Sequence, residues 1–576
     1  MKKIFLISLL VAAQFVVLAQ QPLTYQMNDD EKARIGEIGL GFRSTAAPVG
    51  PVMNIAEFQP SQGVLVRYPL GIPYTLIAQM SQLVPVTTAV SSSSQANSVR
   101  TLYQSNGVNM SNVNFVIGAT DSYWTRDYGP WFIIDGNDEF GVVDFIYNRP
   151  RHNDDAHMQT MAEFLGINFY AMDMEHTGGN YMTDGYGTAA STSLVLEENS
   201  SMTEQEIREM AHDYLGIDNY LITSDPLGDY IAHIDCWGKF IGVDKVMIAQ
   251  LPTSDSRYQD YEDVANFFAN TTTPWGNKYR VYRVFEPGGS IATPYTNCLI
   301  LNDHVFLPVA GTYNSQSYDE DAVITYQNAM PGYTIVPITQ ATMTPWENTD
   351  ALHCRTHEIS DLGMLLIRHY PILGAQPYQS SFTLRTDINA YSGQSLVSDS
   401  LLVYYRITEP NQTAGNWQTT TLVPVGGKTF EATISGIEDT CQVEYYIFAK
   451  DQSNRREKHP YIGAYDPHIF TVGHNPDLGG GGDDDDDDTD TTDLISNYSH
   501  INFQVMPNPA HDCFRATASN GKTLTVFNSN GQLVATQSFN GQKTISVDCS
   551  SWRAGTYFVR VENNYGSVKQ VKVVVY

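Results

Sequence analysis

Four side chains scattered along the chain could together carry out covalent catalysis: Cys354, His233, Asp235 and Asp127. A cysteine thiolate is a strong nucleophile, and an imidazole transfers protons near neutral pH. Two carboxylates can hold a substrate group whose positive charge is delocalised. These residue types therefore predict attack by Cys354 on a guanidinium carbon, with His233 as general acid and base and the two aspartates as anchors.

The neighbours of these side chains also favour a site. Cys354 lies in the polar string DALHCRTHE, residues 350–358, and Asp127 lies in WTRDYGPW, residues 124–131. In an extended strand, residues two apart point to the same face, so we expect His233 and Asp235 to project together. Each string alone also fits a structural role, because free cysteines are often buried small hydrophobes.

The elements that must position these residues alternate between strand and helix. Short apolar runs at 63–68 and 245–249 predict strands, and the pattern at 201–215 predicts a helix capped by Ser201 or Thr203. We therefore expect one large α/β domain over residues 48–375. Alternating strand signals over 376–473 predict a β-sandwich of immunoglobulin type.

The segments outside these two expected domains have compositions of their own. Residues 1–19 have the basic start, apolar run and small-residue end of a signal peptide, and 20–47 form a polar leader with no clear element. Residues 474–500 contain four glycines and six aspartates in a row, which predict an extended linker, with a calcium site as the alternative. Residues 501–576 again show only strand signals.

Composition excludes several classes of protein. The formal net charge is −30, which argues against a nucleic-acid partner and favours encounter with cationic substrates. Six cysteines are too few for a disulfide framework, and no His/Cys cluster has the spacing of a zinc site. No segment after the first 19 residues is apolar enough to cross a bilayer. We expect a secreted monomer that needs neither metal nor cofactor.

The strings together resemble a known superfamily. The order of WTRD, GGN at 178–180, HID at 233–235 and a late HCRTH is similar to the guanidine-modifying, or pentein, superfamily, and most similar to the Porphyromonas-type peptidylarginine deiminases. The resemblance implies a five-bladed α/β propeller and hydrolysis of peptidyl-arginine to citrulline and ammonia. In it, Cys354 matches the nucleophile, His233 the acid-base, and Asp127 and Asp235 the residues that grip the substrate.

The same resemblance assigns the substrate-binding residues. Arg149 and Arg151 match a pair that binds the carboxylate of a C-terminal arginine, which suits two guanidinium forks, although two structural arginines are the alternative. Trp124 and Tyr230 are expected to line the arginine side chain, and Thr349 to orient the site. Ala232 replaces the family's asparagine, and Tyr128-Gly129-Pro130 replaces Tyr-Thr-Gly, which brings this loop nearer to the agmatine deiminases.

The last 76 residues, 501–576, carry a second resemblance. VMPNPA at 505–510, an Asn-Gly turn at 530–531 and AGTY at 554–557 are similar to the C-terminal sorting domain of the type IX secretion system. This implies delivery to the outer cell surface and a partner in that machinery. An ordinary small β-domain is the alternative.

Three other functions remain open from the sequence. Deimination of agmatine or free arginine would use the same four residues but would leave Arg149 and Arg151 without a task. A papain-like thiol protease also needs a cysteine and a histidine, but the expected string around an early cysteine is missing. A surface adhesin would need no Cys354, so Cys354→Ala would leave its effect intact.

Overall fold

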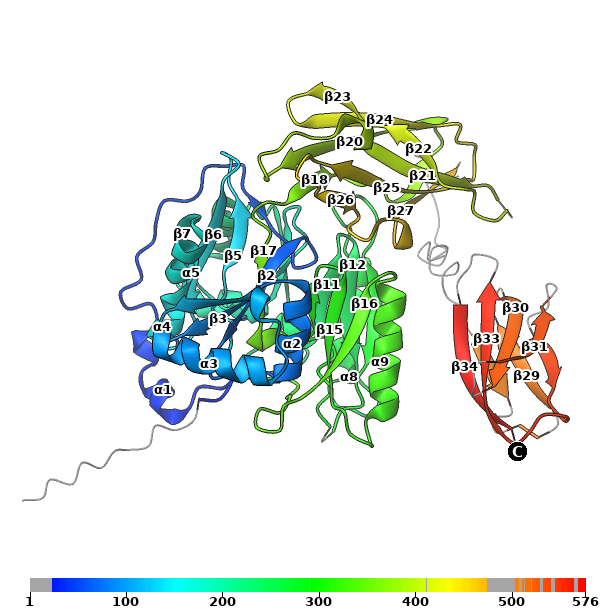
Figure 1. Ribbon diagram of the computed structural model, residues 1–576, viewed down its shortest axis with the longest axis horizontal. Helices are drawn as coiled ribbons and strands as arrows, with labels where there is room; N and C mark the ends of the chain where they lie inside the picture. Colours follow the sequence, from blue (N-terminus) through cyan, green and yellow to red (C-terminus); the bar gives the residue numbers. More distant parts are fainter. Residues whose placement is uncertain are drawn as a thin grey trace, which may run out of the picture.

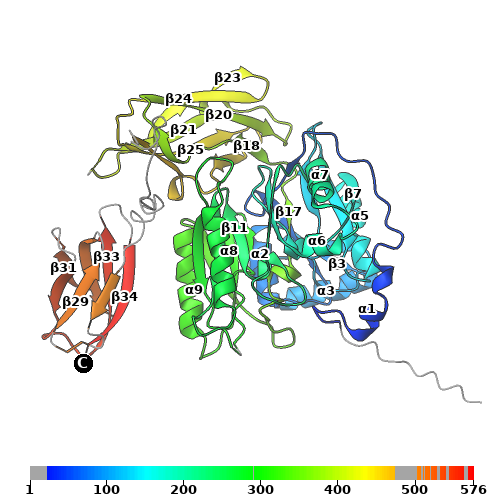
Figure 2. The ribbon, with the colours of Figure 1, turned by 180° about the vertical axis from the view of Figure 1, so that it is seen from behind.

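The computed structural model describes residues 23–289, 291–410, 412–473, 503–506, 510–511, 513–518, 521–528, 532–539, 544–563 and 568–575. The signal peptide and linker expected at 1–19 and 474–500 lie outside these residues. Figure 1 shows an α/β part, a β part above it and a separate β part at the C-terminal end, and Figure 2 shows the same parts from behind. Among the described residues, no helix is long and apolar enough to span a membrane.

The α/β part contains five sheets of three or four strands. Their strand orders, with the bounds of each strand, are β17 (His357–Ser360), β2 (Ser61–Arg67), β3 (Val86–Val90), β4 (Val113–Ile117); β1 (Met53–Asn54), β5 (Trp131–Ile134), β6 (Phe140–Tyr147), β7 (Asn168–His176); β10 (Asn219–Thr223), β9 (Thr188–Thr192), β8 (Met182–Thr183); β11 (Gly238–Gly242), β12 (Lys245–Gln250), β13 (Arg280–Phe285); and β14 (Leu299–Leu301), β15 (His304–Val309), β16 (Thr334–Thr339).

All five sheets repeat one pattern. A first strand pairs antiparallel with a second, and the second pairs parallel with a third. Parallel neighbours need a crossover, and helices supply it. They are α2 (Tyr74–Leu83) and α3 (Ser93–Ser105), α4 (His152–Asp155) and α5 (His157–Leu165), α6 (Leu194–Glu198) and α7 (Glu204–Leu215), α8 (Tyr258–Asn270), and α9 (Gln316–Ala329). The late strand β17 completes the sheet that β2 begins.

The sequence predicted several of these elements. The helix expected at 201–215 is α7, where Thr203 accepts from the backbone of Glu206 and Glu206 reaches back to Thr203, a capping box. Gly216 ends this helix in the left-handed conformation, and Ile207, Ala211 and Leu215 face the core. The leader differs from expectation, because it contains α1 (Asp29–Ala33) and the 3₁₀ helix η1 (Ile35–Glu37).

The second part consists of two sheets that share one apolar core. One has the order β18 (Leu365–His369), β20 (Ser381–Ala390), β24 (Thr429–Ser435), β23 (Val423–Gly426); the other has β19 (Gly374–Pro377), β27 (His468–Gly473), β25 (Gln442–Lys450), β21 (Leu402–Thr408), β22 (Gln418–Thr421), with β26 (Arg456–His459) beside β25. Leu384, Val443 and Phe470 lie in the core between them. Because β18 pairs with β20, these sheets begin before residue 376.

The named strands of the C-terminal part pair antiparallel. Its sheets are β28 (Phe503–Met506), β29 (Cys513–Ala518), β32 (Thr544–Asp548), and β31 (Leu533–Ser538), β30 (Gly521–Asn528), β33 (Gly555–Asn563), β34 (Val568–Val575). Strands β29 and β32 alternate buried and exposed residues, as expected for a sheet with one packed face.

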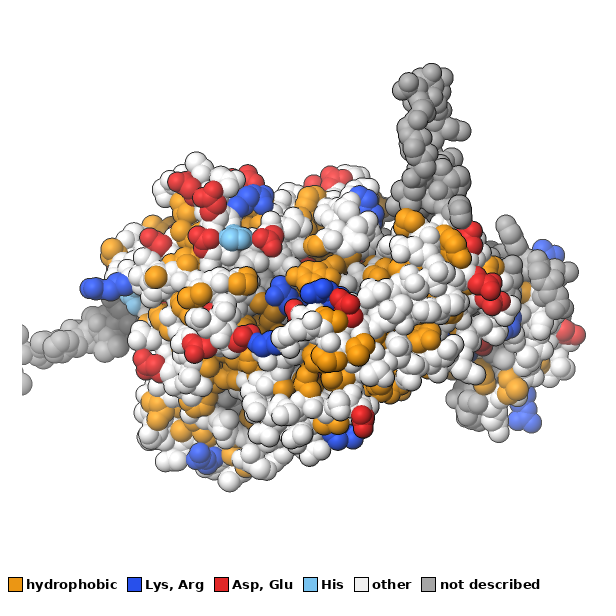
Figure 3. Space-filling model, turned by 90° about the horizontal axis from the view of Figure 1, so that it is seen from above, with side chains coloured by type: hydrophobic (Ala, Val, Ile, Leu, Met, Phe, Trp, Pro, Cys, Tyr) orange, Lys and Arg blue, Asp and Glu red, His pale blue; other side chains and the backbone are white. Residues whose placement is uncertain are grey.

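In the view of Figure 3, acidic and basic side chains are interspersed with hydrophobic ones on the surface.

Candidate active site

The predicted catalytic residues occupy equivalent positions in the repeated sheets. Asp127 lies in the loop before β5, Asp235 before β11 and Cys354 before β17. Asn180 and Asn297 occupy the same kind of position before β8 and β14. The loop preceding the first strand of each sheet therefore presents one polar side chain, and three of these loops are short 3₁₀ helices: η3 (Gly178–Asn180), η4 (Ile234–Cys236) and η5 (His353–Arg355).

Cys354 is held by contacts from two distant loops. The side-chain amide of Asn297 donates to Cys354 Sγ at 3.2 Å, and its Oδ1 accepts from the backbone N–H of Cys354 at 3.3 Å. The backbone N–H of Arg126 donates to the carbonyl of Cys354 at 3.1 Å. Cys354 is a free thiol, as predicted, and only 2% exposed. The candidate nucleophile is therefore fixed at both its backbone and its sulfur.

Asp127 and His233 lie side by side across a glycine. Their Oδ1 and Nδ1 atoms are 3.7 Å apart. A Cβ on Gly179 would lie 2.4 Å from Nδ1 of His233 and 3.0 Å from Oδ1 of Asp127, so only glycine leaves room for both. The extended strand expected for 233–235 is wrong, because residues 234–236 form η4. A three-residue helix has no periodic sequence signal that would predict it.

The two aspartates differ in charge state. Burial and the nearby Asp235 carboxylate raise the pKa of Asp127 well above its ordinary value. Burial would also raise the pKa of Asp235, but the hydrogen bond and charge of His353 outweigh it and hold the pKa below its ordinary value. Because two like charges in one buried site are costly, ionisation of Asp235 is favoured over ionisation of Asp127.

His233 and Cys354 are both neutral near pH 7. Burial lowers the pKa of His233 to about 3, despite the opposing charge of Asp235. A hydrogen bond from Cys236 lowers the pKa of the Cys354 thiol, but burial and the charges of Asp235, Asp350 and Asp127 outweigh it, so the net pKa is raised. A neutral imidazole can accept a proton, and a cation placed beside the aspartates would favour the thiolate.

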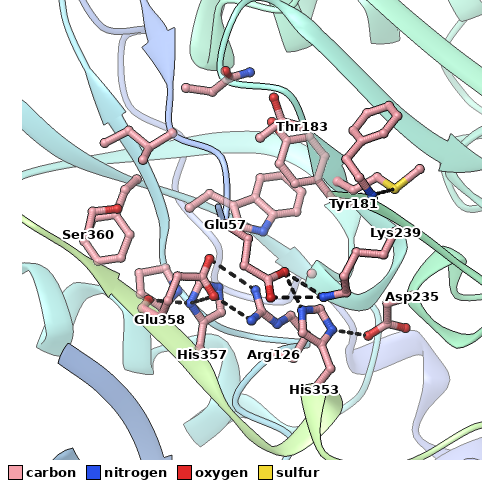
Figure 4. A pocket seen from close by; sticks show the side chains of 18 of the residues that line it. Glu57, Arg126, Tyr181, Thr183, Asp235, Lys239, His353, His357, Glu358 and Ser360 are labelled. Atoms are coloured by element: carbon pink, nitrogen blue, oxygen red, sulfur yellow. Dashed lines mark hydrogen bonds and ion pairs between the residues drawn. The ribbon is translucent and has the colours of Figure 1, made fainter. Parts of the chain in front are cut away.

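A buried polar cluster supports the site from behind (Figure 4). His353 bridges two carboxylates, with Nδ1 2.6 Å from Asp235 and Nε2 2.9 Å from Glu57. Lys239 pairs with Glu57 at 2.8 Å, and Arg126 pairs with Glu358 at 2.6 Å. Burial would raise the pKa of Glu57, but Lys239 and His353 hold it well below its ordinary value. Buried charges are tolerated when they are paired in this way.

The expected substrate-binding residues form two cation–ring pairs. The Arg149 guanidinium lies 5.5 Å from the ring centre of Tyr230, and that of Arg151 lies 4.7 Å from the ring centre of Trp124. Both arginines and Trp124 are buried, whereas Tyr230 is 46% exposed. The charge of Arg149 contributes to the pKa values of both Asp127 and His233, which places it near the catalytic groups.

Three members of the site were not predicted from the sequence: Asn297, His353 and Glu57. His353 was visible as the neighbour of Cys354, but its two carboxylate partners were not. Glu57 lies 296 residues away from His353 and Asn297 lies 57 residues away from Cys354 along the chain. Only the arrangement of the five sheets brings these groups together. The repeated position before each first strand is the signal that could have pointed to Asn297.

A family model describes the part of the chain that carries these residues. The model of the Porphyromonas-type peptidyl-arginine deiminases matches residues 56–359, just over half of the chain, a range that includes the four predicted catalytic residues. The chain belongs to this family. Family membership and the relatives below indicate a deiminase, a hydrolase that acts on the C–N bond of a guanidine group.

Known proteins resemble this deiminase over the same region. A Mycoplasma mycoides protein, named as a candidate agmatine deiminase, is 26% identical over 265 residues, which cover 39% of this chain and 71% of that protein. The solved agmatine deiminase of Enterococcus faecalis is 20% identical, with a TM-score of 0.47 over 55% of this chain and 99% of its own. The Campylobacter jejuni agmatine deiminase is 16% identical and has a TM-score of 0.44. The match covers 54% of this chain and 96% of that protein.

The C-terminal part is a sorting domain. A model of the secretion system C-terminal sorting domain matches residues 504–576, as the sequence predicted. This domain links the deiminase to the type IX secretion machinery. It indicates secretion and attachment at the outer cell surface.

Proposed function

We propose that this enzyme converts arginine residues of peptides to citrulline and ammonia, with a preference for C-terminal arginine. One observation supports the reaction most directly. Asp127 Oδ1 and both ring nitrogens of His233 are buried without a hydrogen-bond partner among the described residues. Such groups are costly to bury, and a guanidinium provides N–H donors in the fork that a carboxylate accepts.

The proposed substrate position lies between the two aspartates. A guanidinium there adds a positive charge beside Cys354, which offsets the carboxylates that raise the pKa of the thiol. The same charge favours ionisation of Asp127, whose pKa is raised by burial and by Asp235. Substrate binding therefore prepares both the anchor and the nucleophile.

The proposed reaction has two halves. In the first, Cys354 Sγ bonds to the guanidinium carbon and its proton passes to His233; the C–N bond then breaks, and His233 protonates the departing ammonia. In the second, His233 takes a proton from water as the oxygen attacks the thiouronium carbon. The C–S bond breaks, the proton on His233 returns to the sulfur, and the hydroxyl proton of the protonated ureido product is released to solvent, which leaves a neutral ureido group. No oxidant or metal is needed in this sequence.

The preference for a terminal carboxylate rests on Arg149 and Arg151. Both are buried, and the Arg149 guanidinium donates to the backbone carbonyl of Asn148 and lies against the Tyr230 ring, with no carboxylate among its hydrogen-bond partners in the described residues. A buried guanidinium without an anion is costly, so a substrate carboxylate would bind there with advantage. We assign Trp124 and Tyr230 to the arginine stem and Thr349 to the rim of the site.

The proposed architecture places this site in a five-bladed propeller. We infer that the five repeated sheets are the blades of a deiminase domain over about 48–375. The two sheets that follow would be an immunoglobulin-like domain to about residue 473. The polar residues before the first strands would then meet at the centre of the propeller, where one substrate contacts all of them.

Deimination of agmatine is the second candidate. It is favoured by the Gly129-Pro130 loop, in which a Cβ on Gly129 would lie 2.1 Å from the ring of His357, so threonine does not fit there. Comparing kcat/KM for an arginine-terminated dipeptide, its C-terminal amide and agmatine tests the assignment. We expect the dipeptide acid to be the best substrate. Faster turnover of agmatine would overturn the peptide assignment.

A further inference from the structure

The N-terminal segment already binds one of the two candidate carboxylate-binding arginines. Nε of Arg151 lies 2.7 Å from Oε1 of Glu31, and its Nη2 donates to the carbonyl of Thr24 at 3.0 Å. The side chains of Arg151 and Glu31 are 3% and 1% exposed. A carboxylate this deeply buried is stable because of its charged partner, so the pair is a built contact between the leader and the deiminase domain.

Local structure aims Glu31 at Arg151. Glu31 is the third residue of α1, where its Oε2 accepts from the backbone N–H of Asn28 at 3.0 Å and the Asn28 side chain accepts from the N–H of Glu31 at 2.9 Å. This capping box uses one carboxylate oxygen and leaves the other for Arg151. The carboxylate is therefore held in one orientation.

The same segment touches the other loops that carry candidate substrate-binding residues. Tyr25 packs on the apolar cluster that contains Leu227 and Ile231, and it lies beside Thr349 and Asp229. Arg34 donates to the carbonyl of Pro150 at 3.2 Å. Residues 24–37, which we call the N-terminal strap, thus connect the loops around 150, 229 and 349.

We propose that Glu31 is a specificity-determining residue that occupies, on Arg151, the place of a substrate carboxylate. This rests on the proposed function, in which Arg149 and Arg151 bind the terminal carboxylate of the peptide. Glu31 balances the charge of Arg151 and accepts the hydrogen bond from its Nε. A substrate carboxylate therefore gains less binding free energy from this arginine. With the strap in place, Arg149 is the one of the two arginines with no ion-paired carboxylate among the described residues, and arginine-terminated peptides bind more weakly than the two arginines would allow.

The inference predicts an effect confined to substrates that carry a carboxylate. Glu31→Gln keeps the size of the side chain but removes its charge, so Arg151 loses the carboxylate that is hydrogen-bonded to its Nε. In the full chain, we expect KM for an arginine-terminated dipeptide to fall about tenfold, the scale of one charge-assisted hydrogen bond, with kcat unchanged. KM for the dipeptide amide and for agmatine should stay the same.

The matched control is Glu37→Gln on the same strap, because Glu37 is partly exposed and contacts His152 and Arg34 rather than Arg151. It should change none of the three KM values. Should Glu31→Gln fail to fold, Glu31→Asp keeps the charge but shortens the reach, and an intermediate fall in KM for the acid is expected. An unchanged or raised KM for the acid in a folded Glu31 variant would overturn the inference.

Arg149→Gln separates failure of this inference from failure of the proposed function. If Arg149→Gln raises KM for the dipeptide acid but not for the amide, the carboxylate preference stands, whatever Glu31 does. If Arg149→Gln affects acid and amide equally, the C-terminal preference itself fails, and the role of Glu31 fails with it.

Discussion

His353 Nδ1 lies 2.6 Å from Oδ2 of Asp235, the same oxygen that faces the sulfur of Cys354 at 3.9 Å. His353, the residue before the proposed nucleophile, therefore orients the carboxylate beside it. Because Nε2 of the same ring faces Glu57, the ring satisfies both carboxylates only by donating from both nitrogens. This links the catalytic loops to the buried polar cluster behind them.

Replacing His353 by glutamine should impair catalysis without removing any group that touches the substrate. Glutamine can donate to only one of the two carboxylates, so Asp235 would lose its fixed orientation. We expect kcat to fall about 100-fold, the cost of a misplacement of about 1 Å, with a smaller change in KM. Steady-state citrulline assays check this, with His304→Gln as the control outside the site. An unchanged kcat would contradict the role of His353.

Gly179→Ala should inactivate the enzyme by displacing His233. The added methyl group would lie 2.4 Å from Nδ1 of His233, closer than any side chain tolerates, so the ring must move. A fall in kcat of about 100-fold or more is expected. Gly50→Ala is the control, because a Cβ there meets nothing within 4 Å. Normal kinetics for Gly179→Ala would show that His233 is not confined as described.

In the free enzyme, the Cys354 thiol should react slowly with an alkylating reagent at pH values below its raised pKa. Only the thiolate reacts with iodoacetamide, and the Asp235 charge is one cause of the raised pKa of Cys354. The inactivation rate should rise with pH with a midpoint above about 8.5, and Asp235→Asn should move the midpoint to lower pH. Cys354→Ser controls for other thiols. A midpoint below that of a free cysteine would contradict this charge distribution.

Ala232→Gly should stabilise the protein. Ala232 has φ of 45°, a left-handed conformation that costs a residue with a Cβ about 1–2 kcal/mol. Glycine removes this strain but adds about 0.5–1 kcal/mol of backbone freedom to the unfolded chain, so a net gain of about 0.5–1 kcal/mol is expected. Chemical denaturation measures it. A loss of stability would mean that the strain lies elsewhere.

Mild acid should weaken the contact between the α/β part and the β-sandwich. His369, His459 and His468 lie together there, and Tyr186 of the α/β part bonds to His459. Burial lowers the pKa of His369 to about 4 and of His459 to about 3, the latter with a contribution from the charge of His369. The unfolded chain binds these protons near pH 6.5, so stability is full above that value and falls toward pH 4.

Each of these histidines contributes at most about 3 kcal/mol to this loss. Thermal melts between pH 7 and pH 4 check it, and His459→Asn should flatten the dependence because it removes one of the groups. A melting temperature that stays constant or rises as the pH falls would contradict the prediction.

Features that depend on residues close together in the sequence could be predicted. The α7 helix was predicted with Ser201 or Thr203 as its cap, and the structure has Thr203, because the capping box and the Gly216 terminus lie within 14 residues. The candidate catalytic residues could be named because thiol, imidazole and carboxylate chemistry is specific, and the structure brings His233 close to Asp127 and Cys354 close to Asp235. The extended geometry of 233–235 was wrong, because η4 is set by the packing of its loop against β11 and has no periodicity of its own.

Contacts between distant segments could not be predicted in this way. Asn297 and Glu57 reach the site only through the arrangement of the sheets, and either residue alone resembles an ordinary polar residue. The pairing of Glu31 with Arg151 spans 120 residues, and it changes the picture of a leader without structure. Such pairs depend on tertiary structure, which residue spacing does not encode.

The central claim is that Cys354 bonds covalently to the guanidinium carbon. The direct measurement is intact-protein mass spectrometry of acid-quenched mixtures of enzyme and an arginine-terminated dipeptide, with peptide mapping. We predict that the wild-type enzyme quenched during turnover carries an adduct on Cys354 that retains the peptide and has lost ammonia, and that Cys354→Ala forms neither this adduct nor citrulline. Citrulline formation with no adduct on Cys354, or with an adduct on another residue, would contradict the account.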